Sequence, residues 1–421
     1  MNAHSSVKGW CPGALRPMQS GDGLIVRVRV RGATLDPARA LALTDLARRF
    51  GNGAIDLTRR ANLQIRGVRP QTWTPLLDAL RPLGLLAESE DAERVNIVEP
   101  PLGDLDPGAL IDARAMARTL EAGLLADPAL RALPGKFGFA IDGGGSVPLG
   151  SVGADVSLLA HRAEEGACVA LVLGDERAMA RRVAPSGAVA AALSASRAFL
   201  TFRRGRPGIR RMRHLLAEIG ADALFGEAGL GGRQRTTLID RRSPEPMFGL
   251  RHLGSVPMIG VGAPFGAWGA IDLAAMAEIA AASPAASLRV TPWRAILLAG
   301  LAPDQAEAAL ASLAARGLIV SGADPRRAIA CCPGAPACAS ASVPTRDLAA
   351  AIAAQLNQTT KGSGLHISGC GKGCASSASG LALVGREGLY DLVEGRPGDP
   401  PVMAGLSRDR AMRAALDRFA P

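Results

Sequence analysis

The 421-residue chain has few aromatic residues and no long apolar run. Aromatic residues form only 3% of the composition, too little for the base-stacking surfaces that bind single-stranded nucleic acids. No apolar stretch reaches the length that crosses a bilayer, since Asp272 and Glu278 interrupt the alanine-rich stretch 268–282. The first eight residues lack the apolar core of a secretory signal. We therefore expect a cytoplasmic protein that binds neither nucleic acid nor membranes.

Lysine is also scarce, so the positive charge is almost entirely arginine. The chain has 48 lysines and arginines, of which only Lys8, Lys136, Lys361 and Lys372 are lysines, and its net charge is +10. Arginine binds carboxylates and phosphates in a fixed, bidentate geometry. A small polyanion in a pocket therefore fits this composition at least as well as a nucleic acid does.

The chain contains an internal repeat. Residues 57–68 align with residues 290–301, and the same offset of 233 positions extends without a gap from about residue 26 to residue 100. Chance matching of Ala and Leu is the competing explanation, but shared Thr, Pro, Gly, Asp and Arg at matching positions make it a poor one. The repeat therefore predicts a fused duplication.

Each copy of the repeat has the pattern of one small module. Asp36 is a typical N-cap residue with Pro37 at the first helical position, and Gly51 and Gly84 are typical helix ends. In the first copy the expected strands are 24–30, 54–57, 63–65 and 94–98. The expected helices are 37–50 and a second one that buries Leu76, Leu77, Leu80 and Leu83 and ends at Gly84. This β-α-β-β-α-β order is the ferredoxin-like pattern.

The fold class that follows is α+β, with two ferredoxin-like modules related by a pseudo-twofold axis and an α/β half after each of them. A chain of this length exceeds what one core usually fills. We expect four regions: 1–100 and 236–330 as the modules, 101–235 as the first α/β half, and 331–421 as a half that carries most of the cysteines.

Five of the seven cysteines lie in the last quarter of the chain. Cys332 and Cys338 have C-x5-C spacing, and Cys370 and Cys374 have C-x3-C spacing in a glycine-rich loop. Four thiolates on two such loops suit a [4Fe–4S] cluster. A zinc site fits less well, because zinc knuckles begin with tighter turns, and four unrelated buried cysteines are the third explanation. Cys331 is off the spacing and is interpreted as a bystander.

One strand of the first copy is unusually polar. Alternation places Arg60, Asn62, Gln64 and Arg66 on one side of the strand. The second copy has Trp293, Ala295, Leu297 and Ala299 at the same positions. A solvated strand face is one explanation. The apolar second copy favours the other, a face that binds an anion.

At these residues the sequence resembles the sulfite and nitrite reductase superfamily, whose members hold siroheme beside a [4Fe–4S] cluster. The resemblance covers nearly the whole chain and includes both repeats, the cysteine loops, and Thr58-x-Arg60 followed by Gln64-x-x-Gly67. Within the superfamily the sequence is most similar to the precorrin-3B synthase family of aerobic cobalamin biosynthesis. The segments that carry this similarity are 11–23, 133–145 and 366–375.

The resemblance implies roles for individual residues. The four spaced cysteines match the cluster ligands, Arg60 and Arg94 match arginines of an anion site, and Lys136 matches the first of two active-site lysines. Gly138 stands where the second lysine is expected, which removes a cation that oxyanion reduction needs. Lys372, between two cluster cysteines, is expected to tune the cluster, to contact a propionate, or to face solvent.

The resemblance implies a monooxygenase that hydroxylates precorrin-3A with O2 and forms a lactone from an acetate arm. Precorrin-3A has eight carboxylates and resembles siroheme in shape, so a site built for siroheme could hold it as substrate. Arg60 and Lys136 are the expected catalytic residues, and the expected substrate-binding residues are Arg60, Asn62, Gln64, Arg66, Arg94, Lys136 and Lys372.

The cluster would supply electrons from an external donor or reductase, and a mononuclear non-heme iron would activate O2, although the five histidines show no two-His-one-carboxylate motif. Gly138 weakens the case for sulfite or nitrite as substrate; siroheme is the less favoured cofactor, and the sequence does not decide whether it binds. Two alternatives stay open: a siroheme-dependent sulfite or nitrite reductase, and, more distantly, a zinc-stabilised nucleic-acid-binding protein.

Overall fold

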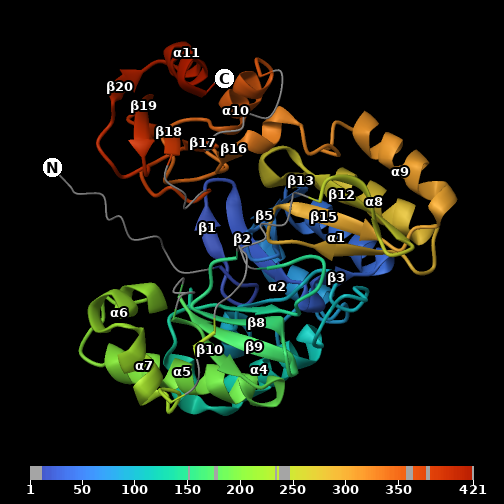
Figure 1. The fold of residues 1–421 in the computed structure, drawn as a ribbon. Helices are drawn as coiled ribbons and strands as arrows, with labels where there is room; N and C mark the ends of the chain where they lie inside the picture. Colours follow the sequence, from blue (N-terminus) through green and yellow to red (C-terminus); the bar gives the residue numbers. More distant parts are fainter. Residues whose placement is uncertain are drawn as a thin grey trace.

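Two central sheets and two outer sheets make up the described part of the computed structural model (Figure 1). In Figure 1 the sheet with β8 and β9 (green) lies at the bottom, the C-terminal sheet (red) at the top, and the central sheets between them. The structure describes residues 12–149, 152–174, 179–232, 235–236, 247–356, 364–375 and 380–419. Cys11, which opens one of the motifs, lies outside these ranges.

The first central sheet contains the polar strand of the first repeat copy. Its order is β1-β2-β5-β4-β13, and the first four strands come from the first copy. Their bounds are Met18–Ser20 (β1), Gly23–Arg29 (β2), Ala54–Leu57 (β4) and Asn62–Val68 (β5), with helices α1 (Pro37–Phe50) and α2 (Pro70–Leu80). The Asp36 carboxylate accepts a hydrogen bond from Arg39 N, as its expected role as N-cap requires.

The second central sheet repeats the first. Its order is β11-β12-β15-β14-β3. The second copy contributes β11 (Gly249–Leu253), β12 (Val256–Gly262), β14 (Ser287–Val290), β15 (Ala295–Ala299), α8 (Ala270–Ala281) and α9 (Pro303–Ala315). Strands β12 and β14 have the bounds of β2 and β4 moved by 233 positions. The left-handed backbone at Ala61 and Gly67 recurs at Arg294 and Gly300, so the predicted register is confirmed down to its turns.

The two modules exchange strands and share one core. Strand β3 (Thr34–Leu35) of the first copy pairs with β14, and β13 (Ala267–Gly269) of the second copy pairs with β4. A single cluster of buried side chains includes Leu43 of α1, Trp268 of β13 and Met276 of α8. The modules therefore form one body rather than two separately packed domains.

The expected strand over 94–98 differs from the structure. Residues Glu90–Arg94 form a short helix, α3, whose N-cap Ser89 accepts a hydrogen bond from Ala92 N. Only Ile97–Val98 form a strand, β6, and it pairs with β7 in an outer sheet. In the first central sheet the position beside β2, where the fourth strand of a ferredoxin-like module pairs, is occupied by β1 instead.

The two outer sheets share one topology, although the segments after the modules differ in sequence. Their orders are β10-β9-β8-β7-β6 and β16-β17-β18-β19-β20, each with two parallel pairings followed by two antiparallel ones. The first half contains β7 (Phe139–Asp142), β8 (Val156–Ala163), β9 (Gly166–Leu173), β10 (Arg181–Val183), α4 (Ala113–Ala126), α5 (Ala188–Arg203), α6 (Met212–Ile219) and α7 (Ala221–Glu227). Within the described residues, the repeat of the fold therefore includes both outer sheets.

The C-terminal half completes the fold. It contains β16 (Ile329–Cys331), β17 (Leu365–Ser368), β18 (Gly380–Arg386), β19 (Leu389–Gly395), β20 (Met403–Leu406), α10 (Arg346–Ala353) and α11 (Arg408–Phe419). Each outer sheet takes its first strand, β6 or β16, from the end of an expected module range. Within the described ranges, no helix has both the length and the apolar composition needed to cross a membrane.

Candidate active site

The two cysteine loops leave the same edge of the C-terminal sheet. Cys332 directly follows β16, and Cys370 follows β17 by two residues. Strands β16 and β17 are parallel neighbours, so their carboxyl ends meet at one edge, the usual position of ligand sites in such sheets. The sheet therefore brings together two loops that are more than thirty residues apart in sequence.

Hydrogen bonds join the two loops directly. The Gly369 N–H donates to Cys332 Sγ at 3.2 Å, and Ser342 N donates to Gly369 O at 2.9 Å. Lys372 Nζ donates to Ser340 Oγ at 3.0 Å, so this lysine connects the loops. A Cβ atom at Gly369 would lie 2.5 Å from the Cβ of Ala341, so glycine is needed for this approach.

The cysteines differ in environment. Cys332 is buried, Cys338 and Cys370 are partly buried, and Cys374 is exposed. Burial raises the pKa of the Cys370 thiol, and the neighbouring Cys338 and Cys332 raise it further. Cys331 lies in the apolar core of the C-terminal half, where burial raises its pKa to about 12, as suits a bystander thiol.

Arg60 precedes the polar strand β5 and contacts Lys136. Thr58 Oγ1 accepts hydrogen bonds from the backbone N–H groups of Arg60 and Asn62 and so shapes the turn between β4 and β5. Arg60 Nη2 donates to the backbone oxygen of Lys136 at 2.8 Å. The structure thus brings together the two expected catalytic residues, which are 76 positions apart in sequence.

The loop that carries Lys136 is held from its other side by Asp155. Gly138 N donates to Asp155 Oδ2 at 2.9 Å, and Arg211 Nε contacts both oxygens of this buried carboxylate. A Cβ atom at Gly138 would have no neighbour closer than 3.7 Å. No Cβ clash therefore requires glycine at this position.

Two other expected residues of the strand, Asn62 and Arg66, form hydrogen bonds or ion pairs with neighbouring residues of the chain. Asn62 is buried and donates from Nδ2 to Arg60 O. Arg66 is 3% exposed and forms ion pairs with Asp22 and Asp56. Its contacts give Arg66 an internal role instead of the direct substrate contact expected for it. Gln64 is half-buried on the same face.

Two arginines on β2 belong to this polar face but were not among the expected site residues. Arg27 pairs across the ladder with Gln64, and Arg29 pairs with Asn62, so all four side chains share one face. Arg27 Nε has no hydrogen-bond partner among the described residues. Burial lowers the pKa of Arg29 to about 10. The alternation of arginine with valine over 26–30 was the signal that could have identified them.

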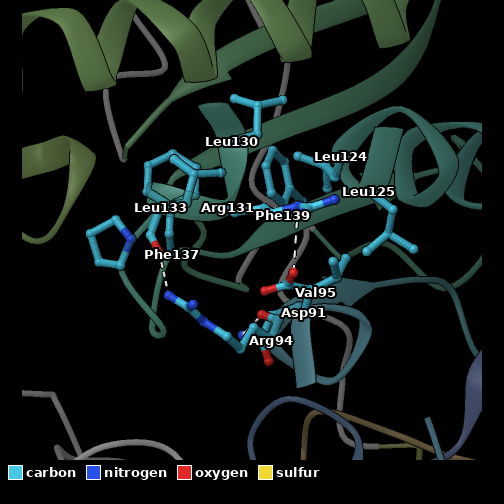
Figure 2. Close-up of a pocket in the computed structure, with 12 residues that line it drawn as sticks. Asp91, Arg94, Val95, Leu124, Leu125, Leu130, Arg131, Leu133, Phe137 and Phe139 are labelled. Atoms are coloured by element: carbon cyan, nitrogen blue, oxygen red, sulfur yellow. Dashed lines mark hydrogen bonds and ion pairs between the residues drawn. The ribbon is translucent and has the colours of Figure 1, made fainter. Parts of the chain in front are cut away.

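Arg94 contacts the loop that carries Lys136 from the end of α3. Its side chain is exposed, and its Nη2 donates to Leu133 O at 3.1 Å. Figure 2 shows Arg94 at a cavity beside the ion pair of Asp91 and Arg131, with an apolar lining that includes Phe137 and Phe139. Neither Arg60 nor Lys136 lines this cavity, but Arg60 and Arg94 both donate to backbone oxygens of the loop that carries Lys136.

The described histidines are dispersed. They lie on different elements: His161 on β8, His214 on α6, His252 on β11 and His366 on β17. Within the described ranges, no three His, Cys, Asp or Glu side chains form a group that could hold a single metal ion. Ligands for a separate iron stay unassigned.

Comparison with known proteins places these features in a family. Residues 16–83 match the model of the nitrite/sulfite reductase ferredoxin-like half domain. A precorrin-3B synthase from Sinorhizobium sp is 32% identical over 399 residues, which cover 92% of this chain and 83% of that protein. The chain belongs to the precorrin-3B synthase family. Its members are enzymes, and the predicted family relationship is confirmed.

Nitrite reductases are more distant relatives. A chloroplastic ferredoxin–nitrite reductase of Oryza sativa is 23% identical over 391 residues, covering 83% of this chain and 64% of that protein. One from Synechococcus elongatus is 33% identical over 135 residues, covering 31% and 26%. The solved structure of the Mycobacterium tuberculosis NirA protein shares the fold, with a TM-score of 0.70, 18% identity, and coverage of 92% of this chain and 78% of the other.

Proposed function

We propose that this chain is a precorrin-3B synthase, which uses O2 to hydroxylate precorrin-3A and closes a lactone on it in aerobic cobalamin biosynthesis. The observation that carries the proposal is the similarity to the Sinorhizobium enzyme along 92% of the chain. In this reaction one oxygen atom enters the macrocycle, and the other leaves as water with two electrons from an external donor.

The arginines of the first central sheet support a polycarboxylate substrate. Guanidinium groups bind carboxylates through paired, charge-assisted hydrogen bonds. Among the described residues Arg27 Nε has no hydrogen-bond partner, whereas the guanidinium of Arg29 donates to Ala92 O and Glu93 O. With Arg60 and Lys136 at the end of the same face, Arg27 would bind and orient the acidic side chains of the macrocycle. Gln64 would add a neutral hydrogen-bonding group between them.

The cysteine loops fit a [4Fe–4S] cluster held by Cys332, Cys338, Cys370 and Cys374. The donor set is four thiols, and the amide of Gly369 already donates to one of the sulfur atoms, as amides commonly do around such clusters. When bound, the cluster would relay electrons to the reaction. Lys372, hydrogen-bonded to Ser340, would place a positive charge between two of the thiolates.

A siroheme-dependent reductase is the alternative that the more distant relatives favour. Gly138 argues against it, because a Cβ atom would meet no clash there and yet the position carries no cation. We expect the wild-type protein to reduce neither nitrite nor sulfite. The variant Gly138→Lys should fold normally and bind these anions more tightly than the wild type, as measured by titration calorimetry. Equal binding by both proteins would show that the residue at position 138 does not determine anion binding.

The direct test supplies precorrin-3A, ¹⁸O2 and a chemical reductant to protein purified without oxygen. Mass spectrometry should find one labelled oxygen atom in the product. Arg60→Gln should lower turnover by about tenfold or more, because it removes a charge-assisted contact. Arg81→Gln, at the exposed C-cap residue of α2, is the control and should retain wild-type turnover. Unlabelled product, or no product, would contradict the proposal.

A further inference from the structure

Arg66 connects the first central sheet to the first cysteine loop. Its guanidinium binds Asp22 through Nε and Nη2, both at 2.8 Å, and Asp56 through Nη1 at 3.0 Å. The Nη2 atom also donates to the backbone oxygen of Ala337 at 2.8 Å. Ala337 directly precedes Cys338, so the donor set of one buried arginine reaches the residue beside an expected cluster ligand.

The turn before β2 is shaped for the same contact. Ser20 Oγ donates to Ala337 O at 2.7 Å, so this oxygen accepts two hydrogen bonds from the first module. A Cβ atom at Gly21 would lie 2.0 Å from Pro336 O, which only glycine avoids. Asp56, already paired with Arg66, also binds Arg346 at 2.6 Å, at the start of the helix that follows the loop.

Arg294 makes the corresponding contact from the second module. It lies in the turn between β14 and β15, with φ at 61°, and its Nη2 donates to Ala375 O at 2.9 Å. Ala375 directly follows Cys374. In the repeat register Arg294 matches Ala61, and Arg66 matches Ala299, so neither contact has a counterpart in the other copy.

We infer that Arg66 and Arg294 are positioning residues that fix the two cysteine loops relative to each other, one from each module. Each arginine holds the carbonyl of a residue adjacent to a cysteine, and Lys372 with Gly369 joins the loops between these points. The inference rests on the proposed function, in which these loops hold the cluster. In this view the two modules determine the spacing of the four thiolates.

The test uses Arg66→Lys, Arg294→Lys and Ser20→Ala in the full chain. Lysine retains the charge but cannot supply the several fixed donors of a guanidinium. Arg289→Lys is the matched control, because Arg289 is equally buried and binds Asp104 Oδ1 at 2.6 Å, in a loop without cysteines. The readouts are hydrogen exchange of the amides in 333–341, iron release to a chelator, and the cluster's midpoint potential.

We expect Arg66→Lys to speed amide exchange in 333–341 by about tenfold, the size of one lost charge-assisted hydrogen bond. Ser20→Ala should act in the same direction with a smaller effect, and it decides the matter if Arg66→Lys does not fold. Both arginine variants should release iron about tenfold faster and shift the midpoint potential, whereas Arg289→Lys should change none of these.

Two failures can be told apart. Wild-type protein without iron and sulfide would overturn the proposed function, and amide exchange would still decide whether Arg66 holds the loop. Wild-type exchange rates in both Arg66→Lys and Ser20→Ala would overturn the positioning role, even if the protein contained a full cluster.

Discussion

At the scale of single residues, position 99 shows how the duplicated halves diverged. In the repeat register Glu99 corresponds to Cys332, so the first half has a carboxylate where the second has an expected cluster ligand. Glu99 accepts a hydrogen bond from Gly32 N at 3.1 Å, and burial raises the pKa of its carboxyl group above the ordinary value. The carboxylate therefore contacts the first module through Gly32, and its burial costs part of the free energy of hydration of the charged group.

This cost predicts a pH-dependent effect of Glu99→Gln. A raised pKa means that the folded state holds its proton more tightly than the unfolded state, so stability falls as pH rises from the ordinary carboxyl range through the raised pKa. Glutamine can still accept from Gly32 N but does not titrate. The stability of Glu99→Gln relative to wild type should therefore rise with pH across this window, in urea unfolding. The exposed control Glu307→Gln should show no such trend, and a trend of opposite sign would contradict the argument.

Sequence patterns predicted the chemistry of some residues and missed the partners of others. Alternation along β5 placed Gln64 and Arg66 opposite the core-facing Leu63 and Ile65, as the structure shows. The pattern could not reveal that Arg66 is occupied by Asp22, 44 positions away, because such a contact depends on how the sheet pairs. Arg94 ends the short helix α3 and does not lie in the strand that was expected there.

At the scale of elements, local signals were reliable and edge strands were not. Capping residues predicted α1 correctly, since Asp36 and Gly51 act within one turn of the helix. The short strands β3 and β13 are exchanged between the modules. They have only two and three residues, which is too few for a hydrophobic period that would predict their pairing. The expected strand over 94–98 failed for the same reason.

The exchanged strand β13 should be a major source of stability. Trp268 is 1% exposed and lies in the core that both modules share. Trp268→Ala should lower the free energy of unfolding by about 3–5 kcal/mol, the usual cost of removing a large buried aromatic side chain. Trp268→Phe should cost less, because the indole nitrogen has no hydrogen-bond partner among the described residues. Urea unfolding measures both, and a loss below about 1 kcal/mol for the alanine variant would show that β13 is dispensable.

At the scale of the whole molecule, the duplication explains both the symmetry and the asymmetry. An ion pair joins each outer half to a central sheet, Asp56 with Arg346 on one side and the buried Arg289 with Asp104 on the other. The apolar face of the second sheet, with Leu297 and Ala299, packs against Leu102 and Val147 of the first half. The corresponding face of the first sheet is polar. Its arginines lie between the loop that carries Lys136 and the first cysteine loop. The sequence predicted this contrast between the copies, but not what covers each face.

The measurement that tests the central claim most directly is the metal and sulfide content of protein purified without oxygen. The account predicts about four iron atoms and four acid-labile sulfides per chain, lost in Cys338→Ser and retained in Cys331→Ala. Zinc without sulfide, or equal iron in both variants, would contradict it.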